Sequence, residues 1–255
     1  MNKKVPFKNK YDTAKKYDKI STCLLYISTA LLICNFILSK TAIPISVIRW
    51  IEIINCLAIV LFSIVEFVVD YIHFGAETHR REDLVDNSFA CLLAENRTES
   101  YYTNDDLKAG LYKMGVNNFE SCFFSYNIAK ADLTCLWLKS IILSLLFIFV
   151  GIVGYNEILI FIVQLSIPAV LLQQSIKHTI FVSRLKNVLE RYRTLFSNLK
   201  SNKNKKNDSE IIRDILEYEA TISWGNTLLD ESTYNKMNAS LSNEWEDLKK
   251  EYSIR

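Results

Sequence analysis

The sequence has little glycine, proline or histidine, with six, three and three of these residues among 255. So few turn-forming residues argue against a sheet-rich or disordered chain and favour a helical one. The histidines are too scattered for an HExxH metal motif, the cysteines form no CxxC pair, and glycine-rich phosphate loops and GxSxG elbows do not occur. We therefore expect an all-α protein that is not an enzyme, with no catalytic residues, metal site or cofactor.

The chain contains four long apolar blocks. They lie at residues 22–38, 51–69, 136–153 and 158–172. With its flanks, each approaches the roughly 20 residues, at about 1.5 Å rise per residue, that cross a bilayer core. Core helices of a soluble bundle are also apolar all round, but four such blocks leave too little polar surface to cover them. The sequence therefore predicts an integral membrane protein with four transmembrane helices.

Basic residues indicate how these helices are oriented. Seven lysines precede the first block, whereas the GYNEI turn between the third and fourth blocks has no basic residue. The positive-inside rule therefore places both termini in the cytoplasm of a multi-pass protein of the cell inner membrane. The predicted parts are residues 1–70 (N-terminal cytoplasmic segment, transmembrane helices 1 and 2), 71–135 (helical cytoplasmic middle segment), 136–174 (transmembrane helices 3 and 4) and 175–255 (helical cytoplasmic tail, linker 201–209).

The cytoplasmic parts carry helical patterns of their own. The periodicity after residue 70 predicts that the second membrane helix continues into the middle segment. TNDDLKAGLYKMG predicts a new helix with Thr103 or Asn104 as its N-cap. The fourth membrane helix is expected to continue as a basic helix to about residue 199. Two further amphipathic helices are expected after the linker.

Polar side chains inside the apolar blocks are candidates to line a pore. They are costly in hydrocarbon and are expected to face water or other helices. Hydrogen bonds between helices, at about 0.6 to 2 kcal/mol each, explain the same residues without any transport. Pro168 predicts a kink in the fourth membrane helix. The candidates are Asn35, Asn55, Glu66, Asp70 and Gln164.

Glu66 and Asp70 are four residues apart, so they share one helix face near the cytoplasmic end of the second membrane helix. Glu66 is expected about one turn deeper in the membrane than Asp70. Two interpretations remain open for this face. Glu66 pairs with a lysine of a neighbouring helix, Lys19 or Lys139, or it faces the water of an assembled pore.

Basic residues next to the membrane helices are candidates to bind phosphate, either of a nucleotide ligand or of an anionic lipid headgroup. Setting the membrane topology explains the same residues. The candidates are Arg80, Arg81, Arg184, Lys186, Arg191 and Arg193.

Three stretches carry a resemblance to a known family. They are GAETHRREDLVDNSF after the second membrane helix, YYTNDDLKAGLYKMGVNNFESCFFSYNIA before the third, and the tail LEYEATISWGNTLLDESTYNKMNASLSNEWEDLK. Together with the order of membrane and cytoplasmic helices, they resemble the SMODS-associated four-transmembrane effector family. The two-helix SLATT membrane effectors are related to that family.

The resemblance implies a pore-forming effector of a bacterial antiphage system that acts by abortive infection. Such an effector is triggered by a cyclic oligonucleotide and disrupts the inner membrane after several copies assemble. Its expected partners are the lipid bilayer, further copies of the chain and a cyclic nucleotide signal, with no DNA or RNA binding. The alternative is a membrane-anchored scaffold that does not conduct, or a small transporter, although the internal repeats usual in transporters are not visible.

Overall fold

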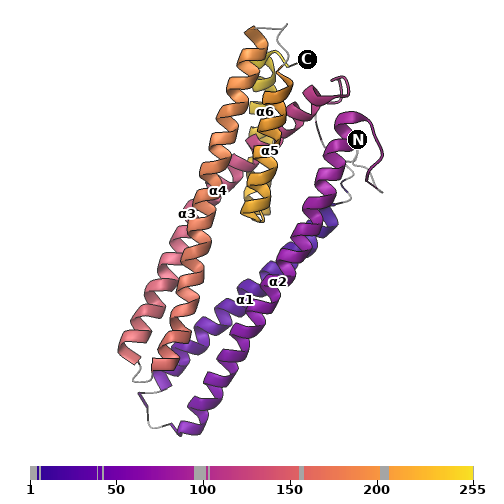
Figure 1. The fold of residues 1–255 in the computed structure, drawn as a ribbon. Helices are drawn as coiled ribbons and strands as arrows, with labels where there is room; N and C mark the ends of the chain where they lie inside the picture. Colours follow the sequence, from indigo (N-terminus) through magenta and orange to yellow (C-terminus); the bar gives the residue numbers. More distant parts are fainter. Residues whose placement is uncertain are drawn as a thin grey trace. The chain divides into compact units, whose positions relative to one another are not determined.

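The computed structural model describes residues 5, 7–38, 40–41, 43–94, 102, 104–154, 158–201 and 207–254, without the side chains of 147, 150–154 and 158–168. Over these residues the chain is all-helical, with six helices and no strand, as predicted (Figure 1). The side chains of Gln164 and Pro168 lie outside this described set. The helices are α1 (Lys8–Leu38), α2 (Ile45–Phe89), α3 (Leu111–Gly154), α4 (Ile158–Ser201), α5 (Asp208–Gly225) and α6 (Glu231–Tyr252).

Helices α2 and α4 are long because nothing in their sequences stops them where the apolar blocks end. Helix α2 runs 45 residues to Phe89, which confirms the predicted extension of the second apolar block. Helix α4 likewise runs through the basic segment to Ser201, which confirms its predicted continuation. Each helix therefore carries an apolar segment and a charged segment without a break in the helix.

The two predicted tail helices are confirmed as α5 and α6. The Asp230 side chain caps α6 by accepting a hydrogen bond from the Thr233 amide at 2.7 Å. Both helices end in a left-handed residue, Asn226 after α5 and Ser253 after α6. Of the predicted linker 201–209, residues 202–206 lie outside the described set, and α5 already begins at Asp208.

The predicted helix start at residues 103–104 is wrong. Helix α3 begins at Leu111, after a turn that includes Gly110 at a φ of +146°. Thr103 lies outside the described residues. Asn104 is buried, and its amide donates hydrogen bonds to Asn117 at 3.0 Å and Glu120 at 2.7 Å. Hydrogen bonds to a later part of the chain therefore replace the local cap.

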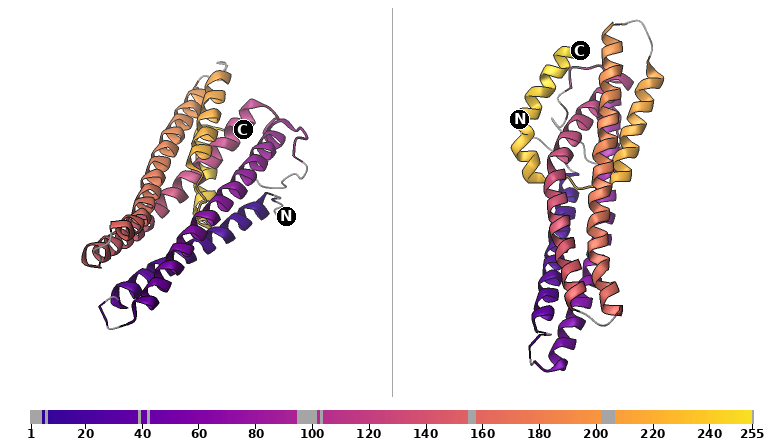
Figure 2. Two further views of the ribbon diagram at one scale, coloured as in Figure 1. Left: turned by 60° about the horizontal axis from the view of Figure 1, so that its bottom comes forward. Right: turned by 90° about the vertical axis from the view of Figure 1, so that its left-hand side faces the viewer.

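The chain divides into two compact units. The first, named here the aromatic unit, comprises Met1–Asn9, Phe74–Thr134 and Lys177–Arg255. It combines the end of α2, the start of α3 and the end of α4 with α5 and α6, and Figure 2 shows α5 and α6 beside these segments of α3 and α4. At its centre the Phe119 ring stacks on Phe196 and Tyr192, at 5.2 and 5.5 Å between centroids, and meets Trp245 edge-on at 5.1 Å.

The second unit, named here the apolar unit, comprises Lys10–His73 and Cys135–Ile176. Helices α1 and α2 run side by side in it (Figure 1), and Leu25, Leu32 and Leu171 form a small buried core. Among the described residues, α1 and α2 are the helices long and apolar enough to cross a membrane. In the apolar window of α2 only 6% of the residues are buried, compared with 33% in α1.

Candidate functional site

The polar residues of the apolar unit gather where α1 meets α2. Ser21, Ser28 and Asn35 of α1 are spaced seven residues apart and are all buried. Seven residues are close to two helical turns, so the three side chains lie on one face of α1. Each of them bonds a side chain of α2. This arrangement builds a row of hydrogen bonds along the two helices.

Each bond in the row joins one polar group of α1 to one of α2. The Ser28 hydroxyl donates to the side-chain amide oxygen of Asn55 at 2.7 Å, and the Ser21 hydroxyl donates to the Glu66 carboxylate. The Asn35 amide donates to the Glu52 carboxylate at 3.3 Å. We name these residues the polar seam: Ser21, Ser28, Asn35, Glu52, Asn55 and Glu66.

The structure therefore brings together three of the predicted membrane residues, Asn35, Asn55 and Glu66. It pairs them between helices of one chain, which is one of the two interpretations that the sequence left open for the asparagines. The sequence reasoning missed their partners Ser21, Ser28 and Glu52. The seven-residue spacing of Ser21, Ser28 and Asn35 is the signal that could have found the α1 side of the seam.

For Glu66, the described residues place the Ser21 hydroxyl against the carboxylate, and Lys139 is near enough to act on it electrostatically. The Lys139 ammonium also lies above the Tyr26 ring, 5.3 Å from its centroid, and Lys19 is exposed. Asp70, the second acid of this face, is exposed as well. A neutral hydroxyl satisfies one lone pair of the carboxylate without neutralising its charge. Both interpretations of Glu66, the lysine pair and the water-facing acid, thus stay open.

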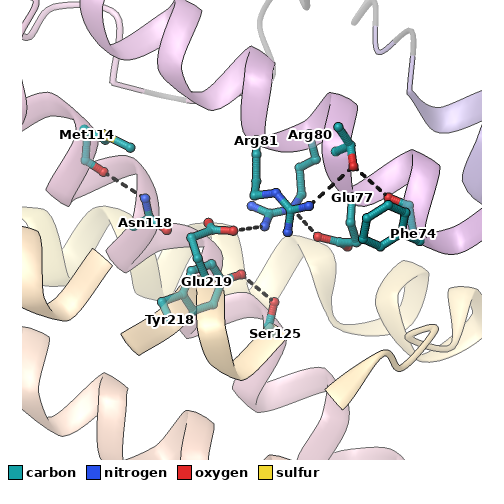
Figure 3. A network of polar contacts seen from close by, with 10 residues as sticks. Phe74, Glu77, Arg80, Arg81, Met114, Asn118, Ser125, Tyr218 and Glu219 are labelled. Atoms are coloured by element: carbon teal, nitrogen blue, oxygen red, sulfur yellow. Dashed lines mark hydrogen bonds and ion pairs between the residues drawn. The ribbon is translucent and has the colours of Figure 1, made fainter. Parts of the chain in front are cut away.

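A second set of polar groups lies inside the aromatic unit, around Arg80 (Figure 3). The Arg80 guanidinium donates to Glu77 at 2.8 Å and to Glu219 of α5 at 2.5 Å. Its central carbon lies 5.8 Å from the centroid of the Tyr218 ring. The group is nearly fully buried, so the ion pair is weakly screened by solvent. We name Glu77, Arg80, Tyr218 and Glu219 the Arg80 cluster.

The Tyr218 ring closes the Arg80 cluster on the side of α3. Its hydroxyl lies 3.3 Å from the Ser125 hydroxyl (Figure 3), and burial raises the pKa of Tyr218 well above its ordinary value. The phenol therefore remains neutral at physiological pH. The cluster ties the end of α2 to α5, which lies almost 140 residues further along the chain.

Asparagines form a further network between α2 and α3 in the aromatic unit. The Asn117 amide donates to Asn87 at 2.9 Å and to Ser88 at 3.3 Å, and Asn117 accepts from Asn104. The neighbouring Asn118 donates to the Met114 carbonyl at 3.4 Å (Figure 3). Buried amides of this kind are stable only when they are hydrogen-bonded. The pattern VNNFE in the sequence thus has a packing role.

The predicted phosphate-binding residues all lie in the aromatic unit, and five of the six have a partner there. The guanidinium of Arg184 stacks over the Trp224 ring at 4.3 Å, and Arg81 donates to the Thr78 hydroxyl at 3.4 Å. Lys186 is exposed. The remaining pairs are Arg191 with Glu217 at 3.7 Å, Arg193 with Glu190 at 3.0 Å, and Arg80 in its cluster. The exposed pairs of Arg191 and Arg193 add little to stability, about 0 to 1 kcal/mol each.

In the part of the chain that the structure describes, one cysteine is fully enclosed and no candidate metal cluster occurs. The Cys122 thiol is fully buried and donates to the Leu185 carbonyl at 3.6 Å. Burial raises the pKa of Cys122 above the range in which a reactive thiolate forms. No group of three or more His, Cys, Asp or Glu side chains that could hold a metal ion occurs among the described residues.

In comparisons with known proteins, no family model matches this chain, and no curated protein or solved structure matches it. Two features of the described residues bear on function. One is the apolar unit with its polar seam and exposed apolar surface, and the other is the charged and amide network inside the aromatic unit.

Proposed function

We propose that this chain is a multi-pass protein of the bacterial inner membrane, with four transmembrane helices and both termini in the cytoplasm. The observation that carries the proposal is the exposed apolar window of α2, of which 6% is buried. Side chains such as Leu57 and Leu61 are more than half exposed on this helix. A contiguous apolar surface of that size is unstable in water and is stable in a bilayer.

Within the membrane, the proposed activity is permeabilisation by an assembly of several copies, as an effector of abortive antiphage defence. The resemblance of the two cytoplasmic stretches and the tail to the four-transmembrane effector family supports this activity. The polar seam bears on where water would pass. Its groups bond each other between α1 and α2, so the path is expected between chains and not within this helix pair.

The proposed trigger is a cyclic oligonucleotide that binds the aromatic unit. Helices α2, α3 and α4 each run without interruption from an apolar block into this unit. A ligand that favours one packing of the aromatic unit over another would act on three continuous helices at once. The exposed arginine pairs and Lys186 supply basic groups for its phosphates.

The proposal is tested by induced expression in bacteria, with and without a cyclic-oligonucleotide synthase. The expected result is loss of membrane potential and uptake of a membrane-impermeant dye only when both proteins are present. Reporter fusions to each terminus report the topology independently, and both are expected in the cytoplasm. Intact membranes under every trigger, with the protein correctly inserted, would contradict the effector function and leave the membrane topology standing.

The second candidate is a membrane-anchored scaffold that does not conduct. One observation favours it, because the seam residues have partners within one chain and need no water. A scaffold keeps the membrane intact in the same assay and co-purifies with a partner through its aromatic unit. The dye-uptake measurement therefore separates the two candidates.

A further inference from the structure

Helix α2 carries a stripe of large apolar residues that α1 does not cover. Their spacings alternate between three and four residues, which is the heptad pattern of a helix–helix seam. All of them are between 48% and 80% exposed. We name them the α2 stripe: Trp50, Ile53, Leu57, Val60, Ile64, Phe67 and Tyr71.

The α2 stripe lies opposite the face of α2 that packs within the chain. Glu52, Asn55 and Glu66, which bond α1, occupy heptad positions on the other side of the helix. The buried Ala58 and Val69 belong to that inner side too. Folding of one chain therefore leaves the stripe open along its full length.

The residues beside the stripe distinguish a protein neighbour from lipid. One flank carries Arg49, Cys56, Ser63 and Asp70, each seven residues from the next and all exposed. The other flank carries Ile54, Leu61 and Val68. Lipid tails favour apolar residues on both flanks, whereas small and polar residues along one flank are typical of helix–helix contacts in membranes. The flank with the small and polar residues is thus suited to contact another helix.

The size of the stripe suits a second copy of the chain. With about 150 to 250 Å² for each aromatic side chain, the exposed area is on the order of 800 Å², comparable with the roughly 800 Å² per partner of stable interfaces. Copies inserted in the same orientation carry the stripe at the same depth. Two stripes can then meet in parallel along their whole length, as symmetric self-association requires.

We infer that the α2 stripe is the surface through which copies of this chain associate side by side in the membrane. The inference rests on the proposed membrane location and names the partner of the assembly as a second copy. It places α2 at the contact between chains and α1 on the inner side of each α2. The polar flank with Ser63 and Asp70 then lies at the edge of the contact.

Leu57 and Leu61 offer a matched test of this contact. They are the same residue type, one turn apart on α2 and exposed at 58% and 51%, but only Leu57 belongs to the stripe. In full-length protein in bacterial membranes, the exposed Cys23, Cys34, Cys56 and Cys135 are replaced by alanine. Leu57→Cys, Ile64→Cys or the control Leu61→Cys is then introduced, and disulfide-linked dimer is measured after oxidation.

The expected result is about fivefold more linked dimer at positions 57 and 64 than at 61, because packing between helices is specific to the facing side. Equal linking at 57 and 61, or more at 61, would overturn the inference.

A second measurement needs no cysteine replacement. Ile64→Ala is compared with Ile54→Ala, a residue of similar exposure outside the stripe, by the mass of the complex in mild detergent. A smaller complex for Ile64→Ala alone is expected, and equal masses for both variants count against the stripe. Neither measurement depends on conduction. Linking of copies through the stripe without dye uptake would contradict the effector function only. Dye uptake by the wild-type protein, together with no excess linking of Leu57→Cys and Ile64→Cys over Leu61→Cys, contradicts the stripe only.

Discussion

The aromatic unit and the apolar unit place their large side chains in opposite ways. Phe119 of the aromatic unit is fully buried among other rings, whereas Phe67 of the apolar unit is 76% exposed. In the aromatic unit the hydrophobic effect works within a single chain. In the apolar unit, large apolar side chains of α2 stay exposed on the single chain. The proposed membrane location supplies the cover that they lack.

The buried polar groups of the two units differ in a corresponding way. The aromatic unit encloses a full charge, Arg80, and places two carboxylates on it. In the apolar unit, hydroxyl and amide groups of α1 donate to one amide and two carboxylates of α2. The aromatic unit thus surrounds a cation with carboxylates, whereas the apolar unit gives its acids neutral donors. The following predictions test this comparison, in order of decreasing effect.

The largest effect is expected from removing an aromatic side chain in the two environments. Phe119→Ala leaves a cavity among Tyr192, Phe196 and Trp245 and should lower the free energy of unfolding of the aromatic unit by about 3 to 5 kcal/mol. Phe67→Ala, the matched control, should leave that free energy within about 0.5 kcal/mol. Thermal unfolding followed by tryptophan fluorescence of purified protein in detergent measures both. Similar losses for the two variants would abolish the distinction between the units.

The next effect concerns the Arg80 cluster. Arg80→Met leaves the buried Glu77 and the half-buried Glu219 without their counter-charge, and we expect a loss of about 3 kcal/mol in unfolding free energy. Arg191→Met breaks an exposed pair with Glu217 and should cost less than about 1 kcal/mol. Denaturant unfolding monitored by circular dichroism compares the two. A small effect of Arg80→Met would mean that water reaches the cluster.

A smaller effect is expected in the polar seam. Ser28→Ala removes the hydrogen bond to Asn55 and should destabilise the α1–α2 pair by about 0.6 to 2 kcal/mol. Ser63→Ala is the control, because the Ser63 hydroxyl bonds only its own helix, at the Ile59 carbonyl. Unfolding by SDS in mixed micelles measures the stability of the α1–α2 pair. If both serines behave alike, the seam does not hold α1 and α2 together.

The smallest effect concerns pH. Burial raises the pKa of Asp132, which accepts a hydrogen bond from the Thr233 hydroxyl at 2.6 Å. A raised pKa in the folded state means that the stability contributed by Asp132 is fully present below its unfolded value of 3.8 and is lost as the pH rises through the folded pKa. Asp132→Asn should remove this acidic-range slope while the remaining pH dependence persists. Unfolding midpoints measured from pH 3 to 7 for both proteins test the sign, and a wild-type stability that rises relative to Asp132→Asn over this range would refute it.

The helices were accessible from the sequence because their signals are local. The periodicity after residue 70 predicted the long α2, and the second apolar block predicted its long apolar segment. The start of α3 was not predicted, because Asn104 can cap a helix locally or bond Asn117 and Glu120 further along the chain. Helix propensity accounts only for the local cap, because the bonds to Asn117 and Glu120 depend on the tertiary structure.

In the candidate sites too, the sequence predicted some residues and the structure alone revealed their partners. Asn35, Asn55 and Glu66 stood out because polar residues in an apolar block are conspicuous in any sequence. Their partners Ser21 and Ser28 did not, because serine is common and its seven-residue spacing acquires meaning only when a second helix lies alongside. Arg80 was singled out for its charge. Its pairing with Glu219 could not be foreseen from residues so far apart in the chain.

The sequence by itself determined the helical class, the long apolar segments and some of the polar residues that pair within them. Those properties follow from composition and from spacing along one helix. Only the tertiary structure decided which groups meet: the hydroxyls of α1 with α2, the guanidinium of α2 with α5, and the asparagine network of α2 and α3. Such contacts depend on how helices pack in space. The same packing left the α2 stripe uncovered, on the face of α2 opposite α1.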